Sequence, residues 1–307
     1  MKIIIITLSP ALDVEYHTLA VNNGINRTYS HTLRAGGKGI NVARAIIKQA
    51  KLNGTYDELD LQNIFPAGGD TGDLLIKILD REGIPRDTIN IDLPTRVNVS
   101  LIPELGDTVE INAPGTAIGE KIYDVTEKTA TYTREKDAVF AICGSSPLGV
   151  EKTYISTLCE IIKKSGHDCI VDCDGEALRH AVLDKKDPIK YPTLIKPNLK
   201  ELSELTGKTL KTALDVENAS RELVKNTGNT TSVIATMGKD GAVVSYPDGG
   251  EIKCKHITSE QRKVCRKKGA GDTFLGTYIY ERYIGGKSPE YAASSASSAA
   301  ADYVEGL

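Results

Sequence analysis

A run of small residues and an aspartate, Gly269-Ala270-Gly271-Asp272, precedes a stretch of helical character that extends to Tyr283. Small residues at the start of a helix let backbone N–H groups point at one ligand, and the helix N-terminus adds positive potential there. Such an anion hole can hold a transferring phosphoryl group while the carboxylate accepts a proton from a substrate hydroxyl. Taken alone, the four residues are better explained by a glycine turn with Asp272 as an ordinary N-cap.

A second glycine cluster, Ala35-Gly36-Gly37-Lys38-Gly39-Ile40-Asn41, also precedes a helical stretch. It is neither a Walker A loop nor the dinucleotide-binding fingerprint that follows the first strand of a Rossmann fold. Its glycines permit close approach of the backbone to a polar ligand, and Lys38 and Asn41 can bond to hydroxyl or phosphate oxygens. A tight strand-to-helix turn with a solvated lysine explains the cluster equally well.

The segment Lys196-Pro197-Asn198-Leu199-Lys200-Glu201 leads into a third predicted helix. Asn198 and Glu201 lie on one face of its first turn, where they can bind Mg²⁺ through its water ligands. The same spacing is a capping box, with Asn198 at the cap and Glu201 three residues on. The capping box is the stronger interpretation in isolation, and the two roles are compatible.

Two more segments are less specific. The first is predicted to be a glycine-bearing turn between two strands, Thr236-Met237-Gly238-Lys239-Asp240-Gly241. Such a turn needs no function, but it can pass close to a nucleotide. The stretch 253–268 holds seven basic residues against the single acidic Glu260. Charge runs are usually solvated loops, but this one leads directly into the predicted anion hole, where it would attract phosphates.

Buried strands and amphipathic helices alternate along the chain. The predicted strands are almost continuously apolar, as strands buried on both faces of a parallel sheet are: Lys2–Leu8, Asn63–Phe65, Ala138–Cys143, Cys169–Val171, Thr193–Ile195 and Ser232–Ala235. Apolar residues spaced three or four apart predict helices around 40–47, 74–79 and 155–162. This alternation indicates a layered α/β fold.

Two segments alternate polar and apolar residues instead, around Val14–Leu33 and Arg96–Ile111. This pattern predicts antiparallel strands with one solvated face. We expect the two insertions to form a small β-sheet beside the main body, where it can cover a site or form a dimer contact.

Composition excludes several classes of protein. The 307 residues are enough for one large α/β domain or two small ones, and 40% apolar with 26% charged residues is typical of a globular chain. Aromatic residues make up only 5% and the net charge is -3, so neither the basic surface nor the stacking rings of a nucleic-acid-binding protein are evident. No apolar run is long enough for a membrane span or a signal peptide. Six cysteines without a Cys-x-x-Cys pair predict neither a zinc site nor a disulfide framework and favour the reducing cytoplasm.

In this order and on this α/β pattern, the motifs resemble those of the ribokinase-like carbohydrate kinases of the phosphofructokinase B type. The resemblance rests on Gly269–Asp272, on the segment 36–44 and on Lys196–Glu201, and it extends nearly end to end. It implies one domain over 1–307, a three-layer α/β/α sandwich, with a small β-sheet lid formed by about 13–33 and 91–112. Further segments look most like the subgroup with 1-phosphofructokinase and tagatose-6-phosphate kinase: Ser9–Asp13, Thr95–Val99, Glu110–Asn112 and Asp174–Leu178.

The resemblance implies roles for individual residues. Asp272 is the expected catalytic base, and Gly269, Ala270 and Gly271 would supply the anion hole. The expected substrate-binding residues are Asp13, Gly37, Lys38, Asn41, Arg96 and Ser145, with Arg96 on the phosphate that the substrate already carries. ATP would be bordered by Lys196, Thr236, Gly238 and Gly241, while Asn198 and Glu201 would hold Mg²⁺ through water.

The implied activity is ATP-dependent phosphorylation of a ketohexose phosphate, with conversion of fructose 1-phosphate to fructose 1,6-bisphosphate as the first expectation. Tagatose 6-phosphate and fructose 6-phosphate remain alternative substrates. A catalytically weak sugar-phosphate-binding protein is an alternative of another class, against which Asp272 argues because a binder needs no base. A nicotinamide-dependent dehydrogenase is disfavoured because the turn Ser9–Asp13 lacks the required glycines. The expected partners are a sugar phosphate and ATP, with no nucleic acid and no membrane, in a cytoplasmic homodimer formed through the lid.

Overall fold

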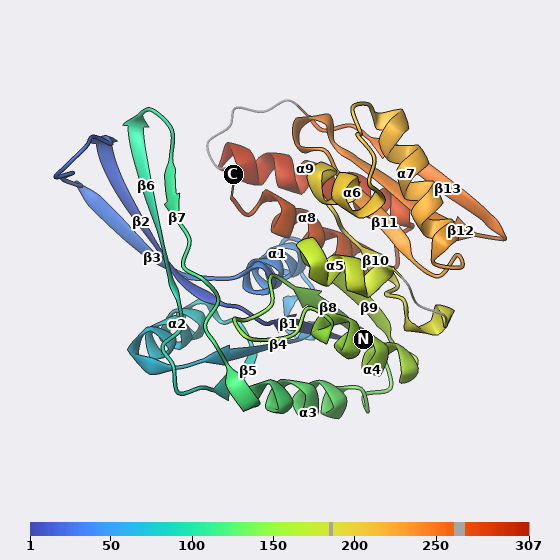
Figure 1. Cartoon of the computed structure of the whole chain (residues 1–307), viewed down its shortest axis with the longest axis horizontal. Coiled ribbons are helices and arrows are strands. Elements are labelled where there is room, and N and C mark those ends of the chain that lie inside the picture. Colours follow the sequence, from blue (N-terminus) through green and yellow to red (C-terminus); the bar gives the residue numbers. More distant parts are fainter. Residues whose placement is uncertain (184–186, 261–267, 307) are drawn as a thin grey trace.

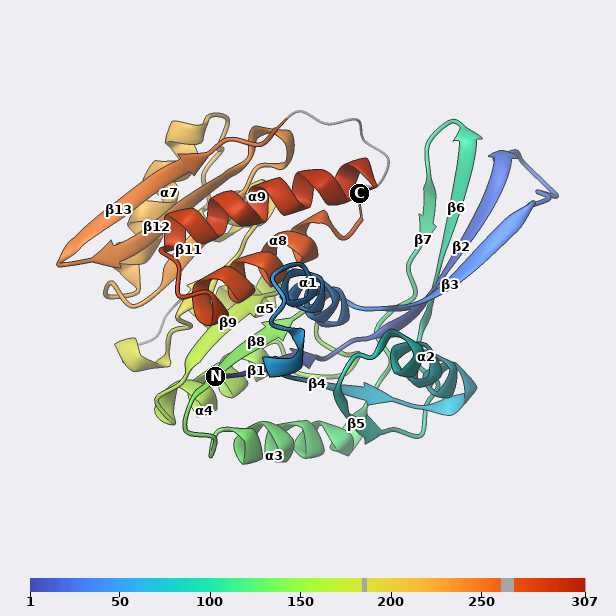
Figure 2. The same ribbon diagram turned by 180° about the vertical axis from the view of Figure 1, so that it is seen from behind.

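The computed structural model describes residues 1–183, 187–260 and 268–306. A nine-stranded sheet runs through the centre of this part, with helices on both faces (Figures 1 and 2). In spatial order its strands are β13 (Glu251–Ile257), β12 (Ala242–Asp248), β11 (Ser232–Thr236), β10 (Leu194–Ile195), β9 (Asp168–Asp172), β8 (Ala138–Cys143), β1 (Lys2–Thr7), β4 (Asp60–Ala67) and β5 (Arg86–Asn90). Neighbours from β11 to β5 pair in parallel, whereas β12 and β13 form an antiparallel edge.

The first strand shows why this sheet is buried on both faces. Side chains alternate along β1, so that Ile3 and Ile5 enter one core while Ile4 and Ile6 enter the other. All four isoleucines are fully buried. Burial of one such side chain contributes about 1.5–3 kcal/mol, so a continuous apolar run stabilises both layers at once.

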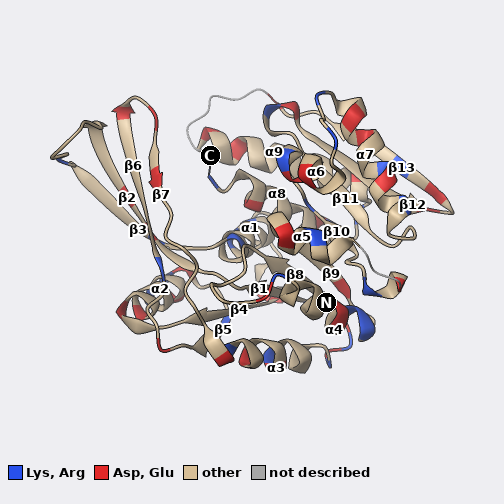
Figure 3. Cartoon of the chain, viewed as in Figure 1, with Lys and Arg blue, Asp and Glu red and all other residues tan. Residues whose placement is uncertain are grey.

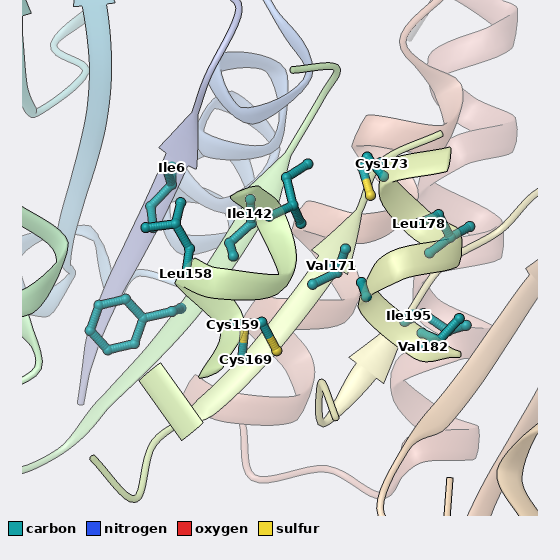
Figure 4. Close-up of a cluster of buried hydrophobic side chains, with 14 of the residues drawn as sticks. Ile6, Ile142, Leu158, Cys159, Cys169, Val171, Cys173, Leu178, Val182 and Ile195 are labelled. Carbon is teal, nitrogen blue, oxygen red and sulfur yellow. The ribbon is translucent and has the colours of Figure 1, made fainter. Parts of the chain in front are cut away.

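Different helices close the two cores. One face carries α1 (Lys38–Leu52), α2 (Gly69–Glu82), α8 (Ala270–Ile279) and α9 (Pro289–Glu305). The other carries α3 (Ile122–Tyr132), α4 (Tyr154–Lys164), α5 (Gly175–Val182), α6 (Leu199–Thr206) and α7 (Ala213–Asn226). Figure 4 shows the second core, where Leu158 of α4 lies near Ile142 of β8 and Val182 of α5 lies near Ile195 of β10. The predicted three-layer α/β/α architecture is confirmed.

Short turns complete the described elements: η1 (Tyr56–Glu58), η2 (Gly119–Lys121), η3 (Pro188–Lys190), η4 (Gly238–Asp240) and the π-helical η5 (Tyr280–Ile284), which continues α8. The predicted buried strands correspond to β1, β4, β8, β9, β10 and β11, and the predicted helices to α1, α2 and α4. The periodicity of buried side chains therefore located these elements to within a few residues.

A separate four-stranded sheet projects from the body (Figure 1), and we call it the small sheet. Its order is β3 (Ser30–Gly36), β2 (Ala11–Ala20), β6 (Val97–Leu105) and β7 (Val109–Ile111). The prediction of antiparallel strands is wrong for its central pair, because β2 and β6 run parallel. Both strands leave the carboxyl-terminal edge of the parallel core sheet, β2 shortly after β1 and β6 after β5, and therefore point the same way.

None of the described helices is long and apolar enough to cross a membrane. None of the five described cysteines forms a disulfide with another described cysteine, and Cys143, Cys159, Cys169 and Cys173 among them are buried. Cys265 lies outside the described residues. Figure 3 shows acidic and basic residues interspersed along the ribbon of the body of the protein.

Candidate active site

Two helices meet where the predicted catalytic residues lie. Helices α1 and α8 pack side by side (Figures 1 and 2). Gly276 makes this approach possible, because an added Cβ would lie only 2.5 Å from Ala45 Cβ and 2.6 Å from the Val42 carbonyl oxygen. The close packing brings the first turns of the two helices together, and with them Asn41 and Asp272.

Asp272 has the environment of a proton acceptor. It lies in the first turn of α8, is 9% exposed, and its Oδ2 accepts a hydrogen bond of 2.8 Å from Asn41 Nδ2. Burial, followed by repulsion from Asp172, raises the pKa of Asp272 to about 6, against the lowering influence of Asn41, Lys196 and Lys38. A carboxylate with a pKa near neutrality is well matched to taking a proton from a hydroxyl.

The residues before Asp272 adopt the conformation that an anion hole requires. Gly269 caps α8 with φ 97°, a left-handed conformation that favours glycine. The N–H groups of the following first turn have no partner inside the helix. A Cβ built on Gly271 would lie 3.6 Å from Lys196 Nζ, so an ammonium group stands beside this turn. Backbone donors, helix dipole and lysine together favour a bound anion.

A buried aspartate outside the predicted motifs holds two lysines at the site. Asp172 ends β9 and is 1% exposed. Its Oδ1 lies 3.4 Å from Lys38 Nζ, and its Oδ2 lies 3.2 Å from Lys196 Nζ. Burial lowers the pKa of Lys38, but attraction to Asp172, Glu201, Asp272 and Asp174 outweighs it, so the net shift is upward and the lysine stays charged. The one sequence signal was position, since Asp172 follows the apolar run Cys169–Val171 and therefore ends a parallel strand.

Asp13, the expected sugar ligand, is held by the small sheet. Its Oδ1 accepts a hydrogen bond of 2.8 Å from Asn98 Nδ2 on β6. Its carboxylate also packs on Gly36, where an added Cβ would lie only 2.3 Å from Asp13 Oδ2. Lys268 Nζ, just before the anion hole, lies 3.7 Å from Asp13 Oδ2. Asn98 and Lys268 were not among the predicted site residues. A polar residue between Val97 and Val99 is the ordinary pattern of a strand with one solvated face, so the position of Asn98 did not indicate a site.

Arg96 has a structural role beyond the one predicted. Its guanidinium donates to the carbonyl oxygens of Ser9, Pro10 and Ala113 at 3.0, 3.3 and 3.0 Å. These bonds tie the small sheet to the end of β1. Burial lowers the pKa of Arg96, against the attraction of Asp13. The contact of Arg96 with a substrate phosphate stays a prediction. The guanidinium would have to make this contact with the N–H groups that do not donate to the three carbonyl oxygens.

The predicted metal and nucleotide residues lie in a neighbouring region. Ser145, Asn198 and Glu201 line one cavity of about 480 Å³, together with Asp174. The predicted capping box is confirmed: Asn198 Oδ1 accepts 2.9 Å from the Glu201 N–H, and Glu201 Oε2 accepts 2.8 Å from the Asn198 N–H. Burial raises the pKa of Glu201, opposed by its backbone hydrogen bond to Asn198. The second carboxylate oxygen accepts no hydrogen bond within the described ranges and suits a hydrated Mg²⁺.

Thr236 connects this cavity with the glycine turn. Its N–H donates 2.9 Å to the Pro197 carbonyl, and it forms a parallel bridge with Asn198. The turn that follows joins β11 to β12, with Gly238 at φ 60° and Gly241 at φ 88°. The predicted turn between two strands is confirmed, whereas the nucleotide contact stays a prediction. In the basic stretch 253–268, positions 261–267 lie outside the described residues, and Lys253 pairs with Asp248 at the surface.

A family model described as pfkB family carbohydrate kinase matches residues 10–305. The chain belongs to this family. ATP-dependent 6-phosphofructokinase isozyme 2 of Escherichia coli (strain K12) is 34% identical to this pfkB kinase over 278 residues, 90% of this chain and 84% of that protein. The 1-phosphofructokinase of Vibrio cholerae serotype O1 is 28% identical over 277 residues, 89% of this chain and 80% of that protein. A crystal structure of phosphofructokinase-2 from Escherichia coli in complex with fructose-6-phosphate has a TM-score of 0.86 at 29% identity and covers 100% of this chain and 94% of that chain.

These relationships agree with the geometry of the site. The pfkB kinase has the ribokinase-like fold that the motifs implied and transfers phosphate to a hydroxyl of a sugar phosphate. The predicted residues Asp272, Gly271, Lys38, Asn41 and Lys196 come together around Asp172 and the first turn of α8. Gly269 and Ala270 belong to the same turn, Gly37 is the N-cap of α1, and Asp13 lies on the small sheet, where Arg96 directly precedes β6. Ser145, Asn198 and Glu201 line the 480 Å³ cavity, whereas Thr236, Gly238 and Gly241 lie at the end of β11 and in the turn that follows it.

Replacement of Gly269 by alanine in this pfkB kinase should distort the anion hole. A Cβ at this position meets Tyr303 Oη at 2.6 Å, and the left-handed φ costs about 1–3 kcal/mol for a residue with a side chain. We expect Gly269→Ala to lower kcat at least about tenfold. Gly286→Ala is the matched control, because Gly286 has φ 63° but nothing within 4 Å of an added Cβ. Equal kcat values for the two variants would show that the loop geometry is not needed.

The raised pKa of Asp272 predicts an acid limb in the rate profile. With a pKa of about 6, the carboxyl is protonated below that pH and cannot accept a proton. We expect kcat at saturating substrates to fall about tenfold per pH unit well below pH 6 and to be level, with respect to this group, above about pH 7. A limb centred at the ordinary value of 3.8 would contradict the assignment.

Proposed function

We propose that this chain transfers the γ-phosphoryl group of ATP to a primary hydroxyl of a fructose monophosphate, giving fructose 1,6-bisphosphate, with fructose 6-phosphate as the preferred substrate. The observation that carries the proposal is the buried Asp272 carboxylate, with its raised pKa, in the first turn of a helix that begins with Gly269-Ala270-Gly271. Base and anion hole on one helical turn are the two parts that phosphoryl transfer to an alcohol requires.

Each group has a defined task in this proposal. Asp272 takes the proton of the attacking hydroxyl, and Asn41 orients its carboxylate. The first-turn N–H groups of α8 hold the transferring phosphoryl group, whose negative charge Lys196 and Lys38 help to balance. Asp13, fixed by Asn98, accepts hydrogen bonds from sugar hydroxyls.

The choice of substrate rests on two opposing indications. The segments Ser9–Asp13 and Thr95–Val99 favour fructose 1-phosphate, because they resemble the 1-phosphofructokinase subgroup. Identity is higher with the 6-phosphofructokinase isozyme, 34% against 28%, which favours fructose 6-phosphate. Both substrates give the same product, since one is phosphorylated at O1 and the other at O6. The difference is only which end of the sugar lies at Asp272 and which end presents its phosphate.

Mg²⁺ and ATP are assigned to the cavity beside this centre. Asn198 and Glu201 would hold the ion through water, and the ion would supply positive charge to the ATP phosphates. Thr236, Gly238 and Gly241 would border the nucleotide, because their turn adjoins Asn198. The small sheet would act as the lid, and we propose the cytoplasm as the compartment, in line with the free cysteines.

The direct test is a substrate panel. ADP formation would be measured in the presence of ATP and Mg²⁺ with one sugar phosphate at a time. The three sugar phosphates are fructose 6-phosphate, fructose 1-phosphate and tagatose 6-phosphate. The proposal predicts the highest kcat/KM for fructose 6-phosphate. A higher value for fructose 1-phosphate would reverse the orientation of the sugar, and a preference for tagatose 6-phosphate would overturn the substrate class. Thermal stabilisation by these sugars without ADP formation would instead indicate a binding protein.

The small sheet also predicts a homodimer. Its exposed apolar side chains are too numerous for a surface that only meets water. They are Leu19, Leu33, Leu105, Val109 and Ile111 on its strands and Ile25 and Tyr29 in the connection between β2 and β3, and Figure 3 shows few charged residues along these strands. We expect sedimentation velocity to give a dimer for the unaltered chain and a monomer for Ile111→Glu. Leu52→Glu, on an exposed position of α1, is the control that should remain dimeric. A monomeric unaltered chain at micromolar concentration would contradict the assignment.

A further inference from the structure

Arg44 connects the base to helix α2, which lies on the same face of the core sheet, by a continuous chain of hydrogen bonds. Its Nη1 donates 2.8 Å to Asn41 Oδ1, one turn earlier on α1. Its Nε and Nη2 donate to the two carboxylate oxygens of Glu82 on α2, at 2.7 and 3.1 Å. Nη2 also donates 2.5 Å to the Ala35 carbonyl oxygen. The guanidinium is therefore held in a single orientation by three partners from different segments.

The contact with Asn41 decides which way the asparagine amide faces. An amide has an oxygen that only accepts and a nitrogen that only donates. Because Arg44 can only donate, it holds Oδ1 on its own side and leaves Nδ2 to donate 2.8 Å to Asp272 Oδ2. In the flipped orientation the amide oxygen would face the carboxylate of Asp272, and the amino group would face the guanidinium, which is unfavourable at both ends.

We propose that Arg44 is a positioning residue for phosphoryl transfer, which locks the Asn41 amide so that its amino group holds the carboxylate of Asp272 in place for the attacking hydroxyl. The inference rests on the proposed role of Asp272 as the base. Glu82 is the counter-ion that keeps Arg44 in place and neutralises its charge.

Arg44 acts through Asn41 and not as a neighbouring charge. The strongest charge influences on Asp272 come from Asp172 on β9, Lys196 after β10 and Lys38 on α1, whereas the hydrogen bonds from Arg44 reach Asp272 through Asn41. The hydrogen bond from Asn41 lowers the pKa of Asp272, so a disordered amide would let that pKa rise. Loss of Arg44 should therefore weaken the base in two ways. The orientation of the Asp272 carboxylate would be less well defined, and a larger fraction of it would be protonated near neutral pH.

The experiment compares Arg44→Met with the unaltered chain, alone and in an Asn41→Ala background. We expect Arg44→Met to lower kcat about tenfold, as loss of one hydrogen bond to a polar network does, and to move the acid limb of kcat up by as much as about one pH unit. In the Asn41→Ala background Arg44→Met should have no further effect on kcat. Multiplicative effects of the two substitutions would overturn the inference.

Two further variants separate positioning from charge and from stability. Arg44→Lys keeps the charge but cannot bond Asn41 and both Glu82 oxygens together, so it should resemble Arg44→Met, whereas rescue of kcat by lysine would overturn the inference. Arg86→Met is the matched control, since Arg86 pairs with Asp80 near α2 at the surface and should leave kcat and the acid limb unchanged.

A spectroscopic readout separates this inference from the base assignment. The carboxyl ¹³C resonance of Asp272 would be identified by its loss in Asp272→Asn and titrated in the unaltered chain and in Arg44→Met. The inference predicts a higher pKa of Asp272 in Arg44→Met, and an unchanged value would overturn it. A raised pKa with an unmoved acid limb of kcat would support the positioning by Arg44 and contradict Asp272 as the base.

Discussion

Replacement of Asp272 by asparagine is expected to lower kcat by about 10³-fold while the protein folds as before. A positioned general base contributes about 10²–10⁴-fold to a rate, and the amide has the shape of the carboxylate but cannot accept the proton. The anion hole and both lysines stay in place, so KM for the sugar phosphate should change little. Steady-state kinetics with saturating ATP and Mg²⁺ would measure both constants.

The stability of this variant gives an independent control. The raised pKa means that the folded state disfavours the ionised carboxylate of Asp272. A neutral amide removes that unfavourable charge, so Tm at neutral pH should be equal to or higher than that of the unaltered chain. Activity within a few-fold of the unaltered chain would show that another group is the base, and a lower Tm would show that the environment of the carboxylate has been misjudged.

Asp172→Asn should have the largest effect on stability. The substitution keeps the shape of the side chain but leaves the ammonium groups of Lys38 and Lys196 without their shared counter-ion. Removal of one partner of a buried ion pair costs about 3–5 kcal/mol, and because Lys38 is 35% exposed we expect about 3 kcal/mol. Urea unfolding at neutral pH would measure the loss as a lower midpoint at constant slope.

The matched control uses a surface pair. Asp80 is 56% exposed and pairs with Arg86, so Asp80→Asn should cost no more than about 1 kcal/mol. Equal losses for Asp172→Asn and Asp80→Asn would mean that the buried lysines find other partners or water. That result would also weaken the role of Asp172 in holding Lys196 beside the first turn of α8.

The sequence predicted the body of the fold well, because its core strands are apolar on both faces and its helices have a clear periodicity. The four consecutive isoleucines of β1 are typical of a strand that is covered on both faces. The direction of β2 relative to β6 was not predictable, since alternation along a strand says which face is wet and nothing about its partner. Parallel pairing followed from where both strands leave the core sheet.

The candidate site was predicted only in part, because local backbone geometry is encoded in short motifs whereas contacts between distant segments are not. Glycine motifs at helix starts identified Asp272, Lys38 and Asn41, because backbone geometry there is local. Asp172 was missed as a site residue because its partners, Lys38 and Lys196, come from distant segments that only the packed structure brings together. Arg44 was missed although Asn41 lies one turn away, because its orientation also depends on Glu82 of another helix. The capping box was foreseen because both of its partners lie within one helical turn.

The most direct test of the central claim is the identity of the product. ³¹P NMR of a reaction containing the protein, ATP, Mg²⁺ and fructose 6-phosphate would follow both phosphates of the sugar. A second sugar phosphate resonance, at C1, is expected to grow in step with ADP and to be absent with Asp272→Asn. The proposed phosphoryl transfer would be contradicted if ATP stayed intact with all three sugars, fructose 6-phosphate, fructose 1-phosphate and tagatose 6-phosphate. It would also be contradicted if ATP were only hydrolysed to inorganic phosphate with each of them.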